Sequence, residues 1–225
     1  MSKLRLFATV ALLGTLATPA AVFAQTSASA TTDLNIRSGP GPQHEVIGFI
    51  DADEEVTVNG CLDGSKWCRV TSDGTEGWAY SDYLTADLSG SIVVLTERYA
   101  DVGVPVVTYE GTGAGEGAAA GAATGAVAGA LIGGPIGAAV GAAAGAVAGG
   151  TAGAVIDPPE TVRTYVTSNR VEPVYLEGEV VIGAGLPETV ELREIPDYEY
   201  RYVYVNGVPV LVEADTRRIV YVVRD

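Results

Sequence analysis

The chain has 225 residues, of which 28 are acidic and 13 basic, and its formal net charge at neutral pH is −15. A surface this acidic argues against a nucleic-acid partner and against electrostatic docking on anionic lipid. One histidine and two cysteines leave few side chains for metal binding or nucleophilic catalysis, so we expect no enzyme activity, no metal and no cofactor.

The first segment has the pattern of a secretory signal. Lys3 and Arg5 precede an apolar run over residues 6–16, and small residues end the segment at Ala24. This order of a basic start, an apolar middle and a small-residue cleavage site predicts a signal peptide over residues 1–24. We therefore expect an exported protein, located in the periplasm or cell envelope.

After a Ser/Thr/Ala-rich stretch, expected to be a flexible tail over 25–31, residues 32–86 read as short strands separated by turn signals at close intervals. That spacing favours a small β-barrel. The segment carries four motifs in order: Leu34-Asn35-Ile36-Arg37-Ser38-Gly39-Pro40, Trp67-Cys68-Arg69-Val70, Gly77-Trp78 and Tyr83-Leu84. In these motifs it resembles the bacterial SH3 family.

The resemblance implies a partly open barrel of five or six strands that binds a cell-wall peptide or an envelope protein. Ligand grooves of such modules are lined by aromatic and loop residues, which implies ligand roles for Trp67, Tyr80 and Tyr83, with Trp78 beneath them. Arg37 is a further candidate ligand contact. The alternatives are that the two tryptophans are core residues and that Arg37 caps a turn.

The two cysteines flank a predicted turn. Cys61 and Cys68 are equally distant from the centre of a turn between Gly64 and Ser65, so they are expected to face each other across a hairpin. Directly opposed strand residues have Cα atoms about 4.5–5.5 Å apart, which a disulfide can bridge. We predict a structural disulfide.

Residues 87–112 contain two β-branched runs, over 92–96 and 104–108. This segment is interpreted either as a short hairpin or as an extended linker.

Residues 113–156 are dominated by glycine at every fourth position and by alanine between. A break at Gly133, Gly134 and Pro135 predicts two helices, 114–132 and 136–156, forming a Gly/Ala-rich helical hairpin. The glycines expected to pack in these helices are Gly117, Gly121, Gly125, Gly129, Gly137, Gly141, Gly145 and Gly149. Small residues at this spacing favour close helix packing in lipid, and the stretch resembles the glycine-zipper two-helix segments of bacterial envelope proteins. It is expected to associate with membrane or with itself, as a homo-oligomer; a water-exposed spacer is the alternative.

Residues 157–225 are expected to form a small α+β domain. Asp157 and the prolines after it predict a helix that ends near Ser168. Asn206-Gly207, between two apolar strands, predicts a type I′ hairpin, and a third strand over 218–223 completes an antiparallel meander. Alternate residues from Tyr198 to Tyr204 are tyrosines, interpreted either as a binding platform or as packing against the helix. The segment from 159 onward resembles a bacterial envelope domain family of unknown function, which transfers no activity.

The expected fold class is therefore multidomain: an all-β SH3-like barrel, a Gly/Ala-rich helical hairpin and an α+β domain. The expected function is that of a non-enzymatic cell-envelope protein that binds a peptidoglycan peptide or an envelope protein. The alternatives are a soluble periplasmic scaffold and a targeting subunit of a separate wall hydrolase.

Overall fold

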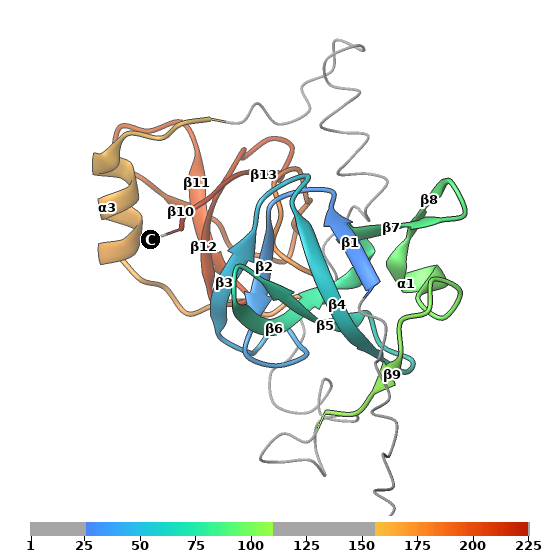
Figure 1. Ribbon diagram of the computed structural model, residues 1–225. Helices are drawn as coiled ribbons and strands as arrows, with labels where there is room; N and C mark the ends of the chain where they lie inside the picture. Colours follow the sequence, from blue (N-terminus) through green and yellow to red (C-terminus); the bar gives the residue numbers. More distant parts are fainter. Residues whose placement is uncertain (1–25, 110–155, 225) are drawn as a thin grey trace, which may run out of the picture.

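A computed structural model describes residues 26–109 and 156–224 (Figure 1). The described part is mostly β-structure, in an SH3-like region and a second, smaller sheet. The signal peptide predicted over 1–24 and the Gly/Ala helical hairpin predicted over 113–156 lie outside it, apart from Ile156. Among the described residues no helix is long and apolar enough to cross a membrane.

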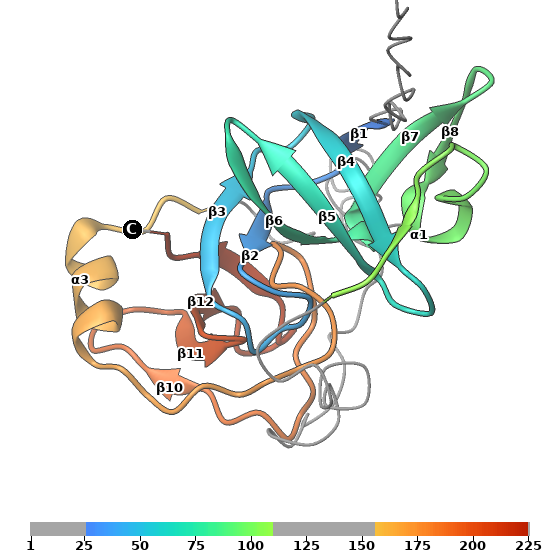
Figure 2. The same cartoon turned by 60° about the horizontal axis from the view of Figure 1, so that its bottom comes forward.

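The amino-terminal region is one strongly curved sheet (Figure 2). Its strands are β1 (Thr26–Ala30), β2 (Leu34–Arg37), β3 (Val46–Ile50), β4 (Glu55–Leu62), β5 (Trp67–Ser72), β6 (Thr75–Tyr80), β7 (Leu84–Leu88), β8 (Ser91–Val94) and β9 (Val106–Val107). The strand order is β3-β2-β6-β5-β4-β1-β7-β8, with β9 added to β4. A 3-10 turn, η1 (Ser81–Tyr83), and a short helix, α1 (Leu95–Arg98), connect strands at one end.

The short strands expected between turn signals over 32–86 are present and include β2 to β6. Leu34 and Ile36 of β2 and Val56 and Val58 of β4 are buried, and they fill the interior of the curved sheet. Burying such side chains supplies about 1.5–3 kcal/mol each, which outweighs the weak intrinsic preferences of short strands.

The prediction of a flexible tail over 25–31 is wrong for the residues that the structure describes. Residues 26–30 form β1, which pairs antiparallel with β4 and β7. Ala28 and Ala30 are buried there. The segment is too poor in large apolar residues to show as a strand by its own pattern; its pairing partners determine its structure.

Residues 87–112 were expected to form either a short hairpin or an extended linker, and the described part of this segment differs from both. Its first β-branched run contributes β8, which pairs back onto β7. Its second run contributes β9, which pairs parallel with β4. Both runs thus extend the SH3-like sheet.

The predicted disulfide is confirmed. Cys61 on β4 and Cys68 on β5 are paired residues with Cα atoms 4.0 Å apart, and they are disulfide-bonded. Both are almost completely buried.

The carboxy-terminal region consists of one helix and a four-stranded sheet. Its elements are α3 (Glu160–Ser168), β10 (Arg193–Glu194), β11 (Arg201–Val205), β12 (Val208–Val212) and β13 (Ile219–Val222), and the strands follow one another in the order β10-β11-β12-β13. The predicted meander is confirmed. Asn206 and Gly207 both have positive φ, 53° and 80°, which the type I′ turn requires.

The helix begins later than Asp157 predicts. Pro159 occupies the N-cap position, without a side-chain hydrogen bond, and Glu160 is the first helical residue. Proline suits this boundary because its φ is already helical and it has no N–H to leave unpaired.

The tyrosines of the β11 strand pack against α3. The hydroxyl of Tyr202 donates to the carbonyl of Asn169 at 2.9 Å, and that of Tyr204 donates to the carbonyl of Val166 at 3.1 Å. Both tyrosines are buried. Of the two interpretations of this tyrosine series, packing on the helix is confirmed for these two residues.

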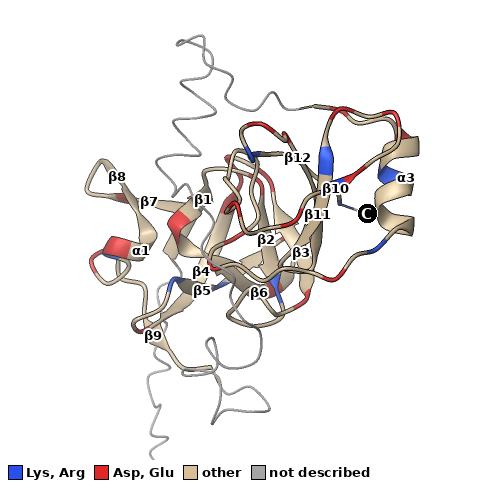
Figure 3. Ribbon diagram, turned by 180° about the vertical axis from the view of Figure 1, so that it is seen from behind, with Lys and Arg blue, Asp and Glu red and all other residues tan. Residues whose placement is uncertain are grey.

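The two regions share one hydrophobic core. Side chains of the SH3-like sheet and side chains from the 176–190 segment and from β11, β12 and β13 belong to the same buried cluster. Acidic residues occur in both regions (Figure 3). Continuous burial across the boundary predicts that the two regions unfold together.

Candidate functional site

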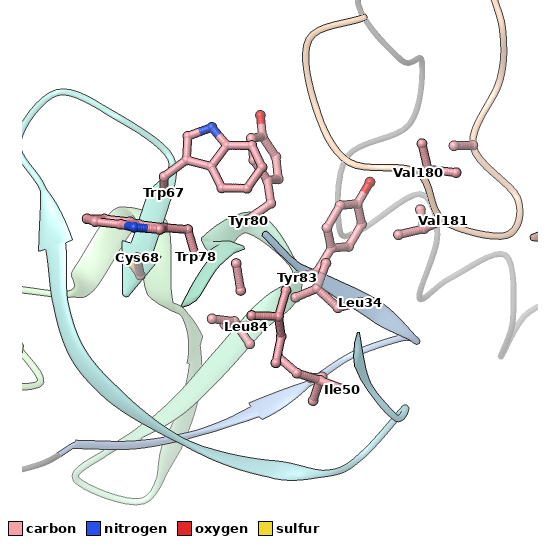
Figure 4. Packing of buried hydrophobic residues seen from close by; sticks show 14 of the residues in the cluster. Leu34, Ile50, Trp67, Cys68, Trp78, Tyr80, Tyr83, Leu84, Val180 and Val181 are labelled. Atoms are coloured by element: carbon pink, nitrogen blue, oxygen red, sulfur yellow. The ribbon is translucent and has the colours of Figure 1, made fainter. Parts of the chain in front are cut away.

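Three aromatic side chains implied as ligand contacts lie together at one end of the SH3-like sheet. Trp67 on β5 pairs with Tyr80 on β6, and their rings meet edge to face with centroids 5.4 Å apart. Tyr83 follows on η1, with its ring 6.1 Å from that of Tyr80. We call Trp67, Tyr80 and Tyr83 the aromatic cluster; Figure 4 shows these three rings and Trp78 close to them.

The turn between β6 and β7 holds the cluster in place. The backbone N–H and the hydroxyl of Ser81 both donate to the carbonyl of Lys66, at 2.8 and 2.9 Å. These bonds tie the 3-10 turn that carries Tyr83 to the residue before Trp67. The relative positions of the three rings are therefore set by backbone contacts.

The cluster is packed more tightly than an open groove. The exposed fractions are 7% for Trp67, 6% for Tyr80 and 3% for Tyr83, so only a small part of each side chain is accessible. Lys66 is the exposed residue at its rim: its Nζ lies 5.7 Å from the centroid of the Tyr80 ring and pairs with Asp82 at 2.8 Å. The ligand roles of the three aromatic residues stay predictions.

Burial and nearby acids keep the two tyrosines of the cluster protonated. Desolvation raises the pKa of Tyr80 well above its ordinary value, and the charges of Asp82, Glu177 and Glu179 raise it further. Desolvation likewise raises the pKa of Tyr83. Both hydroxyls remain neutral hydrogen-bonding groups at physiological pH.

Trp78 lies on β6 two residues before Tyr80 and close to the aromatic cluster (Figure 4). It is buried, and its ring contacts that of Tyr109 edge to face at 5.6 Å. Its burial places Trp78 in the core, which was one of the two interpretations of this residue.

The expectation that Arg37 contacts a ligand is not supported by its position. Its side chain is completely buried and forms an ion pair with Glu179 of the carboxy-terminal region, with Nε 2.5 Å from Oε2. A second bond runs from Nη2 to Oε1 at 2.6 Å. A ligand would have to displace Glu179 to reach this guanidinium.

The alternative reading of Arg37, as the cap of a turn, agrees with its other contacts. Its Nη1 donates to the carbonyls of Pro42 at 3.1 Å and His44 at 2.7 Å, which close the loop between β2 and β3. The same nitrogen donates to the carbonyl of Asn206 at 3.1 Å. Arg37 therefore closes its own loop and joins the two regions.

Glu179 is held in place from both sides of the boundary. Its Oε1 also accepts from Nδ2 of Asn35 at 3.1 Å and from the N–H of Val180 at 2.8 Å. The side chain of Asn206, at the β11–β12 turn, bonds Leu176 and Gly178 and so fixes the segment that carries this glutamate. Every polar group of the ion pair thus has a partner, which is the condition for burying two charges.

The same segment covers part of the SH3-like region next to the cluster. In Figure 4 the ring of Tyr83 points toward the loop that carries Val180 and Val181. Both valines are completely buried. The carboxy-terminal region therefore forms one wall beside the aromatic cluster.

Sequence reasoning did not identify Glu179 or Asn206 as boundary residues. Glu179 is one acid among 28, and its partner Arg37 is 142 positions away, so nothing local marks it. Asn206 was identified only as a turn residue. Within 26–109 and 156–224 no group of three or more His, Cys, Asp or Glu side chains is placed to hold a metal ion.

Comparison with known proteins supports both regional assignments. The family described as "Bacterial SH3 domain" matches residues 32–85, and the family described as "Domain of unknown function (DUF1236)" matches residues 165–224. The chain therefore contains a bacterial SH3 domain followed by a DUF1236 domain at its carboxy-terminal end. Each match covers less than half of the chain.

One curated relative is similar over a limited stretch. The protein named "Putative N-acetylmuramoyl-L-alanine amidase YrvJ" of Bacillus subtilis (strain 168) is 33% identical over 79 residues. These residues are 35% of this chain but only 15% of the relative. A bacterial SH3 domain together with similarity to such a protein suggests a role in binding the cell wall.

Proposed function

We propose that this protein is a non-enzymatic component of the cell envelope whose SH3 domain binds a peptidoglycan peptide. The observation that carries the proposal is the aromatic cluster with Lys66 at its rim, formed at one end of a segment that matches the bacterial SH3 family. Aromatic side chains and an ammonium group suit a short peptide with apolar atoms and a carboxylate. An envelope protein with the same kind of peptide is the alternative ligand.

The proposed role is binding and not catalysis. The described residues include a buried ion pair and a disulfide, and burial raises the pKa values of Tyr80 and Tyr83, which keeps both hydroxyls neutral. The relative's amidase name belongs to that protein, which is mostly outside the matched stretch. The wall hydrolase, if one takes part, is a separate chain that this protein positions.

A sedimentation assay with purified peptidoglycan tests this proposal. The chain without residues 1–24 is expected to pellet with the wall material, and Lys66→Glu is expected to release it. Arg98→Glu is a matched control, because the two side chains are about equally exposed, at 49% and 48%, and Arg98 lies on α1, outside the cluster. Failure of the native chain to pellet, or equal loss in both variants, would reject the proposed site.

We also propose that the glycine-rich stretch over 113–156 associates with membrane or with itself. Its support is the unbroken four-residue glycine spacing in the sequence. Gly125→Leu places a large side chain in that spacing, whereas Ala123→Leu adds a leucine outside it. If the stretch packs in membrane as proposed, the native chain is retained in carbonate-washed membranes and only the first change abolishes this retention; a water-exposed spacer gives no retention of the native chain.

A further inference from the structure

A groove lies between the two domains, and its lining does not include the residues of the aromatic cluster. It has a volume of about 610 Å³ and is lined by β3, by the β11–β12 turn and by residues next to them. Figure 2 shows β3 of the SH3 domain beside β12 of the carboxy-terminal domain. Ligand sites commonly lie at domain interfaces and have volumes of roughly 300–1,000 Å³.

The SH3 wall of the groove is an exposed apolar strand. Ile47 and Phe49 are 44% and 52% exposed, and as alternate residues of β3 they point to the same side. Across the groove lie Val208 and Pro209 of β12. Two exposed apolar side chains facing a partly enclosed space form a binding surface for apolar groups of a partner.

β3 also ends the strand order of its sheet. It pairs with β2 on one side, and no other described strand pairs with its outer edge. An edge strand with free backbone groups can accept an added strand, whose alternate side chains then enter the pockets beside it. The groove therefore favours an extended peptide over a compact small molecule.

Arg224 supplies a positive charge in the groove, whose lining also includes the acidic residue Glu45. Its guanidinium lies 5.8 Å from the centroid of the Phe49 ring, and its Nη1 donates to Oδ2 of Asp33 at 3.2 Å. Its Nε and Nη2 are buried and have no hydrogen-bond partner in the part of the chain that the structure describes. Nε and Nη2 form the side of the guanidinium that binds a carboxylate through two parallel hydrogen bonds.

We propose that this groove binds an extended, acidic segment of a partner protein. The segment adds to the edge of β3, places an apolar side chain against Ile47 and Phe49, and directs a carboxylate to Nε and Nη2 of Arg224. The site does not use the aromatic cluster, so it is independent of the proposed binding of the wall.

The proposal is tested by NMR titration of the isotope-labelled chain without residues 1–24. The probe is the peptide acetyl-Ser-Val-Glu-Val-Ser-amide, and its matched control contains Gln in place of Glu. The acidic peptide is expected to shift the amide signals of Ile47, Phe49 and Val208 in a saturable manner. The Gln peptide is expected to bind about tenfold more weakly, because it loses the charge of a bidentate hydrogen bond.

Two arginine variants separate the proposed contact from a general charge effect. Arg224→Gln is expected to weaken binding of the acidic peptide about tenfold, to the level of the Gln peptide. Arg69→Gln removes another arginine whose buried Nε has no hydrogen-bond partner among the described residues; this Nε lies 3.7 Å from Glu76, outside the groove, and the change is expected to leave binding unchanged. The amide spectrum of each variant reports whether the fold is intact.

Four results would overturn the proposal. The first is the lack of groove shifts at millimolar peptide, and the second is equal binding of the Glu and Gln peptides. The third is a dependence of the same signals on protein concentration, with a dimer in sedimentation, which would assign the groove to a second copy of the chain. Shifts confined to Trp67, Tyr80 and Tyr83 would also reject the groove while supporting the aromatic cluster.

Discussion

The two sides of the domain boundary differ in how completely their polar groups are satisfied. On the closed side, Arg37 and Glu179 are fully buried and every charge has several partners. On the open side, Arg224 has two unpaired nitrogens beside the exposed ring of Phe49. The fully satisfied ion pair joins the domains on one side, whereas Arg224, although paired with Asp33, has two nitrogens without a hydrogen-bond partner beside apolar surface, which makes the other side the candidate for a ligand.

The largest expected effect comes from breaking the closed side. Glu179→Gln keeps the shape of the side chain but leaves the buried guanidinium of Arg37 without a counter-charge. Loss of one member of a buried ion pair destabilises a protein by about 3–5 kcal/mol. Urea unfolding of the variant is expected to show a loss of this size in the free energy of unfolding.

A double variant distinguishes the uncompensated charge from lost packing. Arg37→Met with Glu179→Met removes both charges together, so it is expected to be more stable than Glu179→Gln alone. A decrease of less than about 1 kcal/mol in the free energy of unfolding of Glu179→Gln is typical of an exposed ion pair. It would mean that water reaches Arg37 and Glu179 in solution.

The next effect lies within one domain and serves as a contrast. Replacing Cys61 and Cys68 by serine removes the cross-link of the β4–β5 hairpin, which on the chain-entropy model costs about 2.5 kcal/mol. Neither residue lines the groove, so the peptide titration is expected to be unchanged under conditions where the protein stays folded. The reduced native chain should match the double serine variant in thermal unfolding; a difference between them would point to effects of serine itself.

A smaller effect is expected in alkali, from the aromatic cluster. The folded-state pKa values of Tyr80 and Tyr83 are raised by burial, whereas those of the unfolded chain lie near 10. Above about pH 10 the unfolded state loses protons that the folded state keeps, so the free energy of unfolding falls, by up to about 1.4 kcal/mol per pH unit for each tyrosine. Urea midpoints between pH 9 and 11 measure this, and Tyr80→Phe should flatten the profile; an unchanged slope would indicate that the ring is hydrated.

The smallest effect is expected in mild acid, at the open side. Burial, and secondarily the charge of Arg37, lowers the pKa of His44, which lines the groove. Because the folded-state pKa is below the unfolded one, this contribution to stability is present above about pH 6.5 and is lost as the pH falls through the folded value. Unfolding measured between pH 7.5 and 5.5 should show a decline that His44→Gln reduces. If His44→Gln shows the same decline in the free energy of unfolding, the decline is caused by the protonation of carboxylates and not by His44.

Local patterns were sufficient to predict the elements with strong signals of their own. The closely spaced turn signals over 32–86 predicted short strands, and the pair Asn206-Gly207 predicted a hairpin whose two φ angles are positive. The equal spacing of Cys61 and Cys68 around a turn predicted their bond. In each case the neighbouring residues are enough to decide the structure.

What sequence could not show depends on contacts between distant segments. Strand β1 has a Ser/Thr/Ala sequence and forms because β4 and β7 offer free edges. The burial of Arg37 depends on a glutamate in the other domain, and the groove at Arg224 exists only where β3 meets the β11–β12 turn. A motif alone indicated that Arg37 matters and not what it contacts.

The most direct test of the account asks whether the two domains are one cooperative unit. Both tryptophans of the chain, Trp67 and Trp78, belong to the SH3 domain, so their fluorescence reports that domain alone. NMR signals of Val166 and Val205 report the other domain. A sealed boundary predicts that both probes follow a single urea transition with one midpoint in the native chain. Two separate midpoints in the native chain would contradict the account, because they would show that the ion pair of Arg37 and Glu179 does not join the domains.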